Sequence, residues 1–291
     1  MSKETFAEPW KDYAKRWQKY YRPPGRPSQS AIAEYRRHLR TAKRGLKRKP
    51  RVLIFGSTPE LRDVAYEEKY EVTFIDLNLE MILAMTSIMK HKNPNEIVVR
   101  GNWCDLPFQD HYFDAAMGDV VLSNVPGNLQ DRFLKEIVRV LKNSGYFISK
   151  IEVVPKDFPF EDYEVVLNKF KKVPADFYQD RSCMSIELLV YLHNLTFNYK
   201  KKLIDLSLIV RGLNKYFKKD HFVHPDKKLN VLLNDMWQMW QPMKKTWSVS
   251  WEVEVEKQIK RYFKILNKKV LADCYFRCND QCFPIWLMQV K

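Results

Sequence analysis

The alternation of strand-like and helix-like runs between residues 51 and 150 constrains the fold more than any other feature. Five β-rich runs occur in this stretch, namely "RVLIF", "EVTFID", "EIVVRG", one within "FDAAMGDVVL", and "YFISKIEV". Between them lie "ELRDVAYEEK", "LEMILAMTSIMK" and "LQDRFLKEIVRVLKNSG", where apolar residues recur at helical spacing. Gly145 sits where the last of these helices should have its C-cap. Such alternation favours a parallel sheet with crossover helices, so we predict a doubly wound α/β core.

The flanking segments have a different character. The terminal stretch "KKVLADCYFRCNDQCFPIWLMQVK" predicts an antiparallel hairpin around "NDQ". Residues 153–267 are mostly helical in pattern, and residues 1–50 contain two helix-compatible stretches separated by "RPPGRPS". We therefore expect three parts: a basic N-terminal helical arm (1–50), a core (51–152 and 268–291) and a helical insertion (153–267) that serves as a substrate lid.

The net charge of +15 is unevenly distributed. Residues 1–50 hold 15 Lys and Arg against 4 Asp and Glu, whereas residues 51–150 carry a net −3. This asymmetry indicates either an anionic partner or a solvated basic face. The five cysteines are an odd number in a long chain, which fits a reducing compartment. No apolar run approaches the roughly 20 residues of a membrane span, so we expect a cytoplasmic protein with no membrane association.

The loop after the first strand, "GSTPEL", has a single glycine, Gly56. A dinucleotide site needs G-x-G-x-x-G for close approach to a pyrophosphate, and that pattern is absent. The helix start has two candidate caps, Ser57 in a capping box with Glu60, or Thr58 before a proline. Asp76 follows twenty residues after Gly56, and its carboxylate suits the two hydroxyls of a ribose. These features favour a nucleoside ligand with a cationic group and no phosphate, such as S-adenosylmethionine.

Two later segments support the same ligand. In "GNWCDLPF", Asp105 is placed to accept a hydrogen bond from an adenine amine, and Trp103 to flank the ring. Asp119 ends the fourth strand, beside the expected position of a sulfonium methyl group. Together, "VLIFGSTPELRDVA", "VTFIDLNLEMI", "GNWCDLPFQDHYFDAAMGD" and "FLKEIVRVLKNSGYFISKI" resemble the class I S-adenosylmethionine-dependent methyltransferases. The C-terminal hairpin would supply the sixth and seventh strands of that family's sheet.

The resemblance implies S-adenosylmethionine as the cofactor and a set of site residues. Gly56 and Thr58 would face the methionine part, Asp76 the ribose and Asp105 the adenine amine, and Asp119 would be either a catalytic base or a ligand of the cofactor's amino group. The cofactor-binding set is Gly56, Thr58, Asp76, Leu77, Asn102, Trp103, Asp105 and Asp119. The chain departs from the family pattern at Pro59 and Glu60, where further glycines are usual, and it lacks Asn-Pro-Pro-Tyr after the fourth strand.

Other conspicuous residues have ordinary structural interpretations beside the functional ones. Cys274, Cys278 and Cys282 match no common zinc spacing, so we expect structural thiols and no metal. His221 and His224 are candidates for ligands or a base, but also for surface loop histidines. Tryptophans 237, 240, 247 and 251 are typical of a helical core, or of an aromatic substrate pocket.

The sequence thus predicts an S-adenosylmethionine-dependent methyltransferase. We expect a small-molecule or peptide nucleophile, held under an aromatic lid made by the insertion and the arm. Two alternatives stay open: an RNA methyltransferase that uses the basic flanks, and a non-catalytic cofactor-binding scaffold. The sequence does not indicate the acceptor atom or the oligomeric state.

Overall fold

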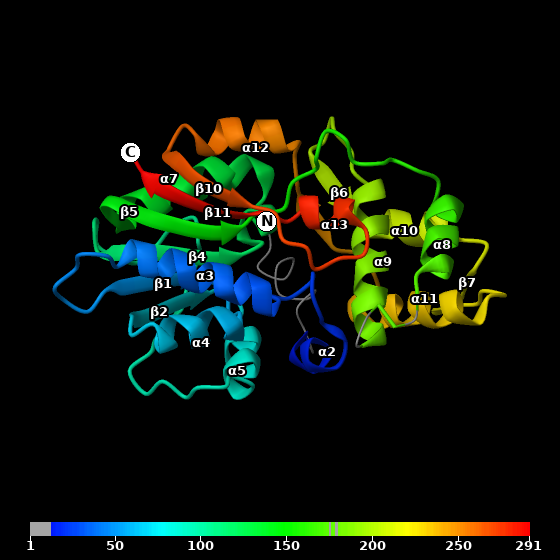
Figure 1. Cartoon of the computed structure of the whole chain (residues 1–291), viewed down its shortest axis with the longest axis horizontal. Helices are drawn as coiled ribbons and strands as arrows, with labels where there is room; N and C mark the ends of the chain where they lie inside the picture. The colour runs from blue at the N-terminus through cyan, green and yellow to red at the C-terminus, as the bar shows by residue number, and fades with distance from the viewer. Residues whose placement is uncertain (1–12, 175, 178–179) are drawn as a thin grey trace.

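A computed structural model describes residues 13–174, 176–177 and 180–291, and it contains a seven-stranded sheet in the order β10-β11-β5-β4-β1-β2-β3 (Figure 1). Strand β11 runs antiparallel to β5 and β10, and the other neighbouring pairs are parallel. The chain order reverses between β1 and β4, and ligands of such sheets bind at this switch point. The predicted doubly wound fold is confirmed. The strands are β1 (Arg51–Phe55), β2 (Glu71–Asp76), β3 (Ile97–Arg100), β4 (Phe113–Asp119), β5 (Leu141–Lys150), β10 (Phe263–Lys269) and β11 (Ile285–Val290).

Helices cover both faces of the sheet because the central strands are apolar on both sides. In β1, Val52 and Ile54 face one hydrophobic layer, and Leu53 and Phe55 face the other. The first layer packs under α3 (Gln29–Ala42), α4 (Pro59–Glu67) and α5 (Leu79–Ser87). The second packs under α6 (Val121–Asn124), α7 (Gln130–Val140) and α12 (Glu252–Ile259), with the short η2 (Gly127–Leu129) before α7.

Two expected element boundaries were wrong. Helix α7 ends at Val140, and Gly145 lies inside β5 rather than at a C-cap. The register between β4 and β5 shifts at this point, and a Cβ on Gly145 would lie 2.8 Å from the Lys142 carbonyl oxygen, so the bulge requires a glycine. The "NDQ" triplet is not a hairpin turn, because it lies in α13 (Arg277–Gln281). The partner of β11 is β10, which begins at Phe263, within the segment expected to be helical insertion.

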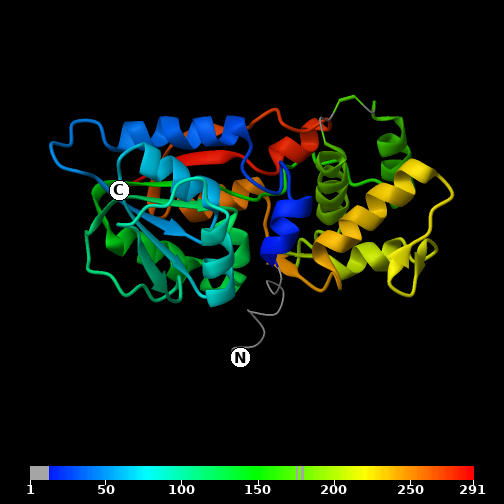
Figure 2. The ribbon, with the colours of Figure 1, turned by 90° about the horizontal axis from the view of Figure 1, so that it is seen from below.

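The insertion forms a separate helical layer beside the sheet (Figure 1). Its elements are α8 (Tyr163–Lys172), α9 (Arg181–Leu195), α10 (Ser207–Gly212), α11 (Lys227–Trp240), and the short strands β6 (Leu203–Asp205), β7 (Phe217–Lys218), β8 (His221–Phe222) and β9 (Thr246–Ser248). Helix α2 (Tyr13–Tyr20) lies between this layer and the core, against α5 and α11 (Figure 2). The earlier part of the predicted arm helix lies outside the described residues. Within the described ranges, no helix is long and apolar enough to cross a membrane.

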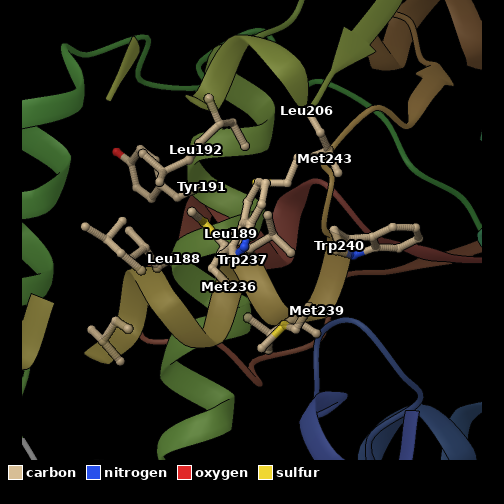
Figure 3. Packing of buried hydrophobic residues seen from close by; sticks show 14 of the residues in the cluster. Leu188, Leu189, Tyr191, Leu192, Leu206, Met236, Trp237, Met239, Trp240 and Met243 are labelled. Atoms are coloured by element: carbon tan, nitrogen blue, oxygen red, sulfur yellow. The ribbon is translucent and has the colours of Figure 1, made fainter. Parts of the chain in front are cut away.

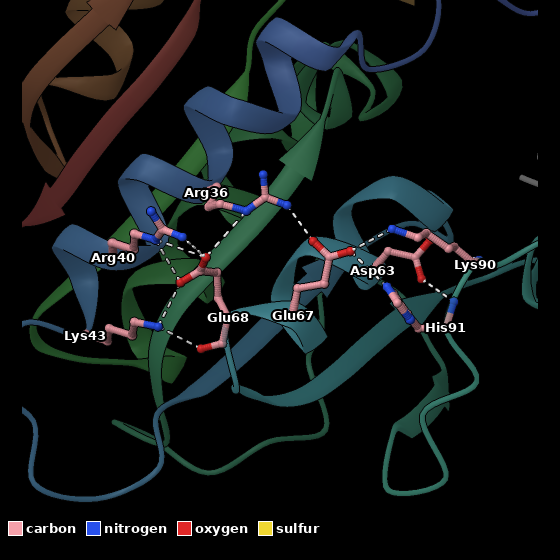
Figure 4. A network of polar contacts seen from close by, with 8 residues as sticks. All are labelled: Arg36, Arg40, Lys43, Asp63, Glu67, Glu68, Lys90 and His91. Carbon is pink, nitrogen blue, oxygen red and sulfur yellow. Dashed lines mark hydrogen bonds and ion pairs between the residues drawn. The ribbon is translucent and has the colours of Figure 1, made fainter.

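The second helix of the arm is fixed to the core by an ion-pair network (Figure 4). Glu68, at the end of α4, is nearly buried and accepts hydrogen bonds from Arg40 at 3.0 Å and Lys43 at 2.8 Å. Arg36 lies 3.4 Å from Glu68 and 2.5 Å from the neighbouring Glu67. Several cations around one shielded carboxylate lower its pKa, because they favour the ionised form against the opposing effect of burial. The cations on this face of α3 are thereby paired with carboxylates at the end of α4.

We expect Glu68→Gln to lower the free energy of unfolding by about 1–3 kcal/mol, because it removes charged hydrogen bonds from a shielded site. Urea denaturation followed by circular dichroism measures this change. Glu71→Gln is the matched control, since Glu71 is half-exposed and pairs with Arg51 at 3.1 Å in a surface bridge that contributes less than about 1 kcal/mol. Equal effects of the two substitutions would contradict the assigned role of Glu68.

Candidate functional site

The carboxyl ends of β1 and β2 place Gly56 and Asp76 side by side. Gly56 adopts φ +80°, and its N–H donates to the Ile75 carbonyl at 2.9 Å. Asp76 accepts hydrogen bonds from the Ser57 hydroxyl at 2.9 Å and from the Asn78 N–H at 3.0 Å. Burial raises the pKa of Asp76, and these donors oppose that shift. The carboxylate is therefore held in one orientation at the strand end, as a ribose-binding group requires.

The loop geometry decides between the two candidate helix caps. Thr58 is the N-cap residue of α4, with Pro59 at the first helical position, and its side chain caps no backbone N–H. The Ser57 hydroxyl is turned toward Asp76 instead of forming a capping box. The loop between β1 and α4 is thus connected to the end of β2 by a side-chain hydrogen bond.

Next to Asp76 lies a partly apolar surface. Leu77 is 47% exposed, although it is a large hydrophobic residue. The Trp103 indole N–H donates to the Ile75 carbonyl at 3.0 Å, and its ring lies 3.7 Å from the position that a Cβ on Gly56 would occupy. Asn102 is exposed, and its side-chain oxygen accepts from the Cys104 N–H. These residues can form the walls of an adenine site.

Asp105 is more exposed to solvent than the neighbouring site residues. Its side chain is 79% exposed and 3.9 Å from the Arg132 guanidinium. The predicted hydrogen bond to an adenine amine would have to compete with this cation and with water. The role of Asp105 in cofactor binding stays a prediction.

The ends of β4 and β5 carry a buried ion pair. Asp119 lies 3.1 Å from the Lys150 ammonium group, and both side chains are almost fully shielded from solvent. Tyr35 of α3 donates its hydroxyl hydrogen to the Gly118 carbonyl at 2.7 Å and accepts from the Lys150 N–H at 2.8 Å. Burial raises the pKa of Asp119, whereas the Lys150 charge lowers it. Asp119 is thus committed to an internal partner, and its predicted role as a base or a cofactor ligand stays a prediction.

The backbone after Asp119 is strained. Val120 adopts a left-handed conformation, with φ 55° and ψ 35°, which is unfavourable for a β-branched residue. Its N–H donates to the Lys150 carbonyl, which holds the turn in place. Strain of this kind is maintained only where the surroundings enforce it, and it concentrates at functional sites.

The arm contributes groups to the same edge of the sheet. Arg26 donates a hydrogen bond to Glu60 in the first turn of α4, and the Pro24 carbonyl accepts from Lys150 at 3.2 Å. Burial raises the pKa of Glu60, Arg26 lowers it, and nearby Asp119 adds a further increase. The second carboxylate oxygen of Glu60 is buried and makes no hydrogen bond. A shielded carboxylate with a free oxygen is a suitable partner for a cationic ligand group.

These residues fit S-adenosylmethionine. The methionine ammonium and the sulfonium are cations, and the site offers the free oxygen of Glu60. The ribose would bind Asp76, and the adenine would lie against Leu77 and Trp103. The guanidinium of Arg26 could pair with the methionine carboxylate. In such a complex Glu60 would supply negative charge at a position where the family pattern usually has glycine.

Trp237 and Trp240 of α11 pack among leucine and methionine side chains of the insertion (Figure 3). A series of ring contacts joins Trp240 to the arm on one side and to β9 on the other. Trp17 stacks on Tyr21 at 5.2 Å between ring centroids, Tyr21 contacts the edge of Trp240 at 6.0 Å, and Trp240 contacts Trp247 at 5.2 Å. Arg26 lies over the Trp17 ring, which links this series to the strand-end carboxylates. We call Trp17, Tyr21, Trp240 and Trp247 the aromatic series.

The remaining candidates lie elsewhere. His221, the first residue of β8, is exposed and pairs with Asp220, and the Nδ1 of His224 accepts from the Asp226 N–H before α11. The neighbouring strand β7 lies at the end of the insertion that is distant from the sheet (Figure 1). Cys274, Cys278 and Cys282 are free thiols in and around α13. Trp237 packs on Phe217, and Trp251 on Phe160 and Phe197. Across the described ranges, no group of three or more His, Cys, Asp or Glu side chains is arranged to hold a metal ion.

Comparison with known proteins agrees with this geometry. Residues 56–149 match a family described as a methyltransferase domain. Demethylmenaquinone methyltransferase from Bacillus pumilus is 30% identical over 124 residues, which are 40% of this chain and 52% of that protein. This chain thus spans about half the length of that curated relative.

Solved structures show the same fold at low sequence identity. A Rhodobacter sphaeroides structure with a provisional Zn-dependent alcohol dehydrogenase name has a TM-score of 0.61 at 12% identity, with all of both chains covered. The PH0226 protein of Pyrococcus horikoshii has a TM-score of 0.54 at 14% identity, again with full coverage. Such likeness shows the fold alone. The family match over residues 56–149, together with the strand order and the strand-end geometry, supports a methyltransferase domain of the class I, S-adenosylmethionine-dependent kind in the α/β core.

Sequence reasoning missed several residues that the fold brings to this edge. Lys150 gave a local signal, as a lysine at the end of an apolar strand. Arg26 and Tyr35 gave none, because their partners lie 34 and 83 residues away in sequence.

We expect Asp76→Ala to weaken binding of both S-adenosylmethionine and S-adenosylhomocysteine by about 10- to 100-fold, because it removes charged hydrogen bonds to the ribose. Isothermal titration calorimetry measures both affinities. Asp110→Ala is the matched control, since Asp110 is an exposed carboxylate paired with Arg139 away from the strand ends. Unchanged affinity in the Asp76 variant would remove this residue from the site.

Proposed function

We propose that the whole chain transfers a methyl group from S-adenosylmethionine to a small-molecule or peptide nucleophile. The observation that carries the proposal is the aromatic series, which spans the arm and the insertion and reaches the strand-end carboxylates through Arg26. Large aromatic side chains beside a few charged groups are typical of sites for compact ligands. In this arrangement the arm and the insertion together form the lid.

The cofactor, when bound, supplies a reactive methyl group on a sulfonium. The protein's contribution is then mainly alignment and exclusion of water. Asp76 would orient the ribose, and Glu60 with Arg26 the methionine end. The Asp119–Lys150 pair would hold the ends of β4 and β5 in place beneath the reacting groups.

The name of the Bacillus pumilus relative gives a small-molecule acceptor, demethylmenaquinone. That name concerns a protein of which this chain covers only half, so it supports the acceptor class rather than that compound. The aromatic series of this chain is compatible with a planar acceptor of similar chemical character.

RNA is the weaker candidate acceptor, because many cations of the basic arm already have partners within the chain. Arm residues in ion pairs with carboxylates are Arg22, Arg26, Arg36, Arg37, Arg40, Lys43 and Arg48. A cation that is paired internally has less charge to offer a phosphate, so the net charge of the arm overstates its affinity for nucleic acid.

The test is methyl transfer from radiolabelled S-adenosylmethionine to a panel of small aromatic nucleophiles, short peptides and tRNA. We expect a small acceptor to be methylated with little dependence on salt. An RNA held through several phosphates would lose roughly a thousandfold or more in affinity between 50 and 200 mM salt. A steeply salt-dependent, submicromolar tRNA complex would overturn the acceptor assignment. Cofactor that binds but is never consumed would favour the scaffold alternative.

Deleting residues 1–21 should lower turnover at least tenfold, because it removes Trp17 and Tyr21 from the lid while Arg26 and α3 remain. Tenfold corresponds to about 1.4 kcal/mol of lost transition-state stabilisation. Turnover and affinity for S-adenosylhomocysteine should be measured together, with urea denaturation of the same samples. Wild-type kinetics in the truncated protein would refute the lid role of the arm.

A further inference from the structure

A second buried acid lies just beyond the ion pair of β5. Glu152 follows Lys150 by two residues, and the chain between them stays extended: the Ile151 N–H donates to Pro284 at 3.0 Å and the Val153 N–H to Cys282 at 2.9 Å. In extended backbone, residues i and i+2 point to the same side. Glu152 is therefore on the side of the sheet edge from which Lys150 reaches Asp119 and Pro24. Its carboxylate is almost fully removed from solvent.

The partner of Glu152 is a histidine from the insertion. The Nε2 of His193, in the last turn of α9, lies 2.9 Å from a Glu152 carboxylate oxygen. The imidazole stacks on Trp247, with ring centroids 4.8 Å apart and an interplanar angle of 28°. Trp247 is the last member of the aromatic series. The pair thus lies where the core meets the proposed acceptor site.

The Glu152 carboxylate faces Nε2 of His193 at ion-pair distance, although these two atoms do not form a hydrogen bond. Its negative charge favours a proton on Nε2, which leaves Nδ1 as a lone-pair acceptor. Among the described residues, the side-chain hydrogen bond to His193 comes from Thr196 and ends on the backbone carbonyl rather than on Nδ1. The pair has the arrangement of a base and its orienting acid.

Two other ionisable groups face the pair. Lys245, in the segment before β9, is half-buried over the Trp247 ring at 5.5 Å. Burial lowers the pKa of Lys245 to about 8, and Glu152 opposes that change. The buried Cys282 thiol has its pKa raised by burial and by Glu152. The carboxylate is thus close to one cation and one neutral thiol, and it can stabilise an additional positive charge on His193.

We propose that His193 is the general base of the methyl transfer and that Glu152 is its positioning residue. The inference rests on the proposed function and narrows the acceptor class to planar aromatic hydroxyl compounds. The acceptor oxygen loses its proton to Nδ1 of His193 as it forms a bond to the methyl carbon. The carbon–sulfur bond breaks with its electron pair kept by sulfur, and the imidazolium is balanced by Glu152.

A general base at His193 argues for a hydroxyl group on the acceptor rather than an amine. A neutral amine can attack through its lone pair before it loses a proton, so it has little need of a base. A phenol is a poor nucleophile until its proton is removed, and it benefits from a base whose pKa is near the working pH. Trp247, on which the imidazole stacks, gives His193 aromatic surroundings that suit an aromatic acceptor.

The experiment uses 2-naphthol and the more acidic 1-nitro-2-naphthol as acceptors for the full-length protein. His193→Gln should reduce methylation of 2-naphthol by about 100- to 10,000-fold, the usual contribution of a general base. The loss should be much smaller for the nitro compound, which is largely ionised without help. Glu152→Gln should also reduce methylation of 2-naphthol more than that of the nitro compound, but by a smaller factor than His193→Gln. His221→Gln is the control, since His221 is exposed on β8 and should leave both rates unchanged.

A second measurement does not depend on turnover. With S-adenosylhomocysteine present, the wild-type protein should bind 1-nitro-2-naphthol as the coloured phenolate at a pH below the free compound's pKa. His193→Gln should bind it in the neutral form. A merely structural histidine would lower both methylation rates alike and leave the spectrum of the bound compound unchanged, and that result would overturn the proposal.

A wrong assignment of His193 as the base and a wrong proposed function would give different experimental results. If the wild-type protein binds S-adenosylhomocysteine and methylates an aryl amine but neither naphthol, the methyltransferase assignment stands and the base assignment falls. If S-adenosylhomocysteine does not bind at millimolar concentration, the proposed function itself fails and the inference falls with it.

Discussion

The organisation of the site depends on the buried ion pair between Asp119 and Lys150. Two charges withdrawn from water are tolerated only when they are paired and their other hydrogen-bonding groups are satisfied. The arm supplies partners on the lysine side of the pair: Tyr35 bridges Gly118 and the Lys150 backbone, and the Pro24 carbonyl accepts from the Lys150 ammonium. These contacts hold the arm at the carboxyl ends of β4 and β5, which places Arg26 beside Glu60 and the Trp17 ring.

The first loop departs from the glycine-rich pattern that is usual between the first strand and the first helix of such sheets. One glycine with positive φ is sufficient for the turn itself. The later positions need not be small if no pyrophosphate has to approach the backbone, and Glu60 places negative charge there instead. A glutamate at this position argues against a dinucleotide, whose pyrophosphate is negative. The same negative charge is favourable for a ligand with an ammonium and a sulfonium.

The shared sheet carries the cofactor, whereas the acceptor chemistry depends on what lies outside it. In the proposed acceptor site the insertion contributes His193 and Trp247, and the core contributes Glu152 from just past β5. On this proposal the methyl-transfer region is assembled from the arm, the core and the insertion.

The sequence by itself determined the doubly wound core, the approximate strands and helices, and the positions of Gly56 and Asp76, because strand–helix periodicity and a loop motif are local signals. It misplaced the end of α7 and the first strand of the C-terminal pair, since a bulge and an edge strand are decided by the register with neighbouring strands. Only the tertiary structure paired Lys150 with Asp119, Arg26 with Glu60, and His193 with Glu152. These partners lie 31, 34 and 41 residues apart, and a contact at such separation leaves no periodic trace in one sequence because it depends on how the elements pack.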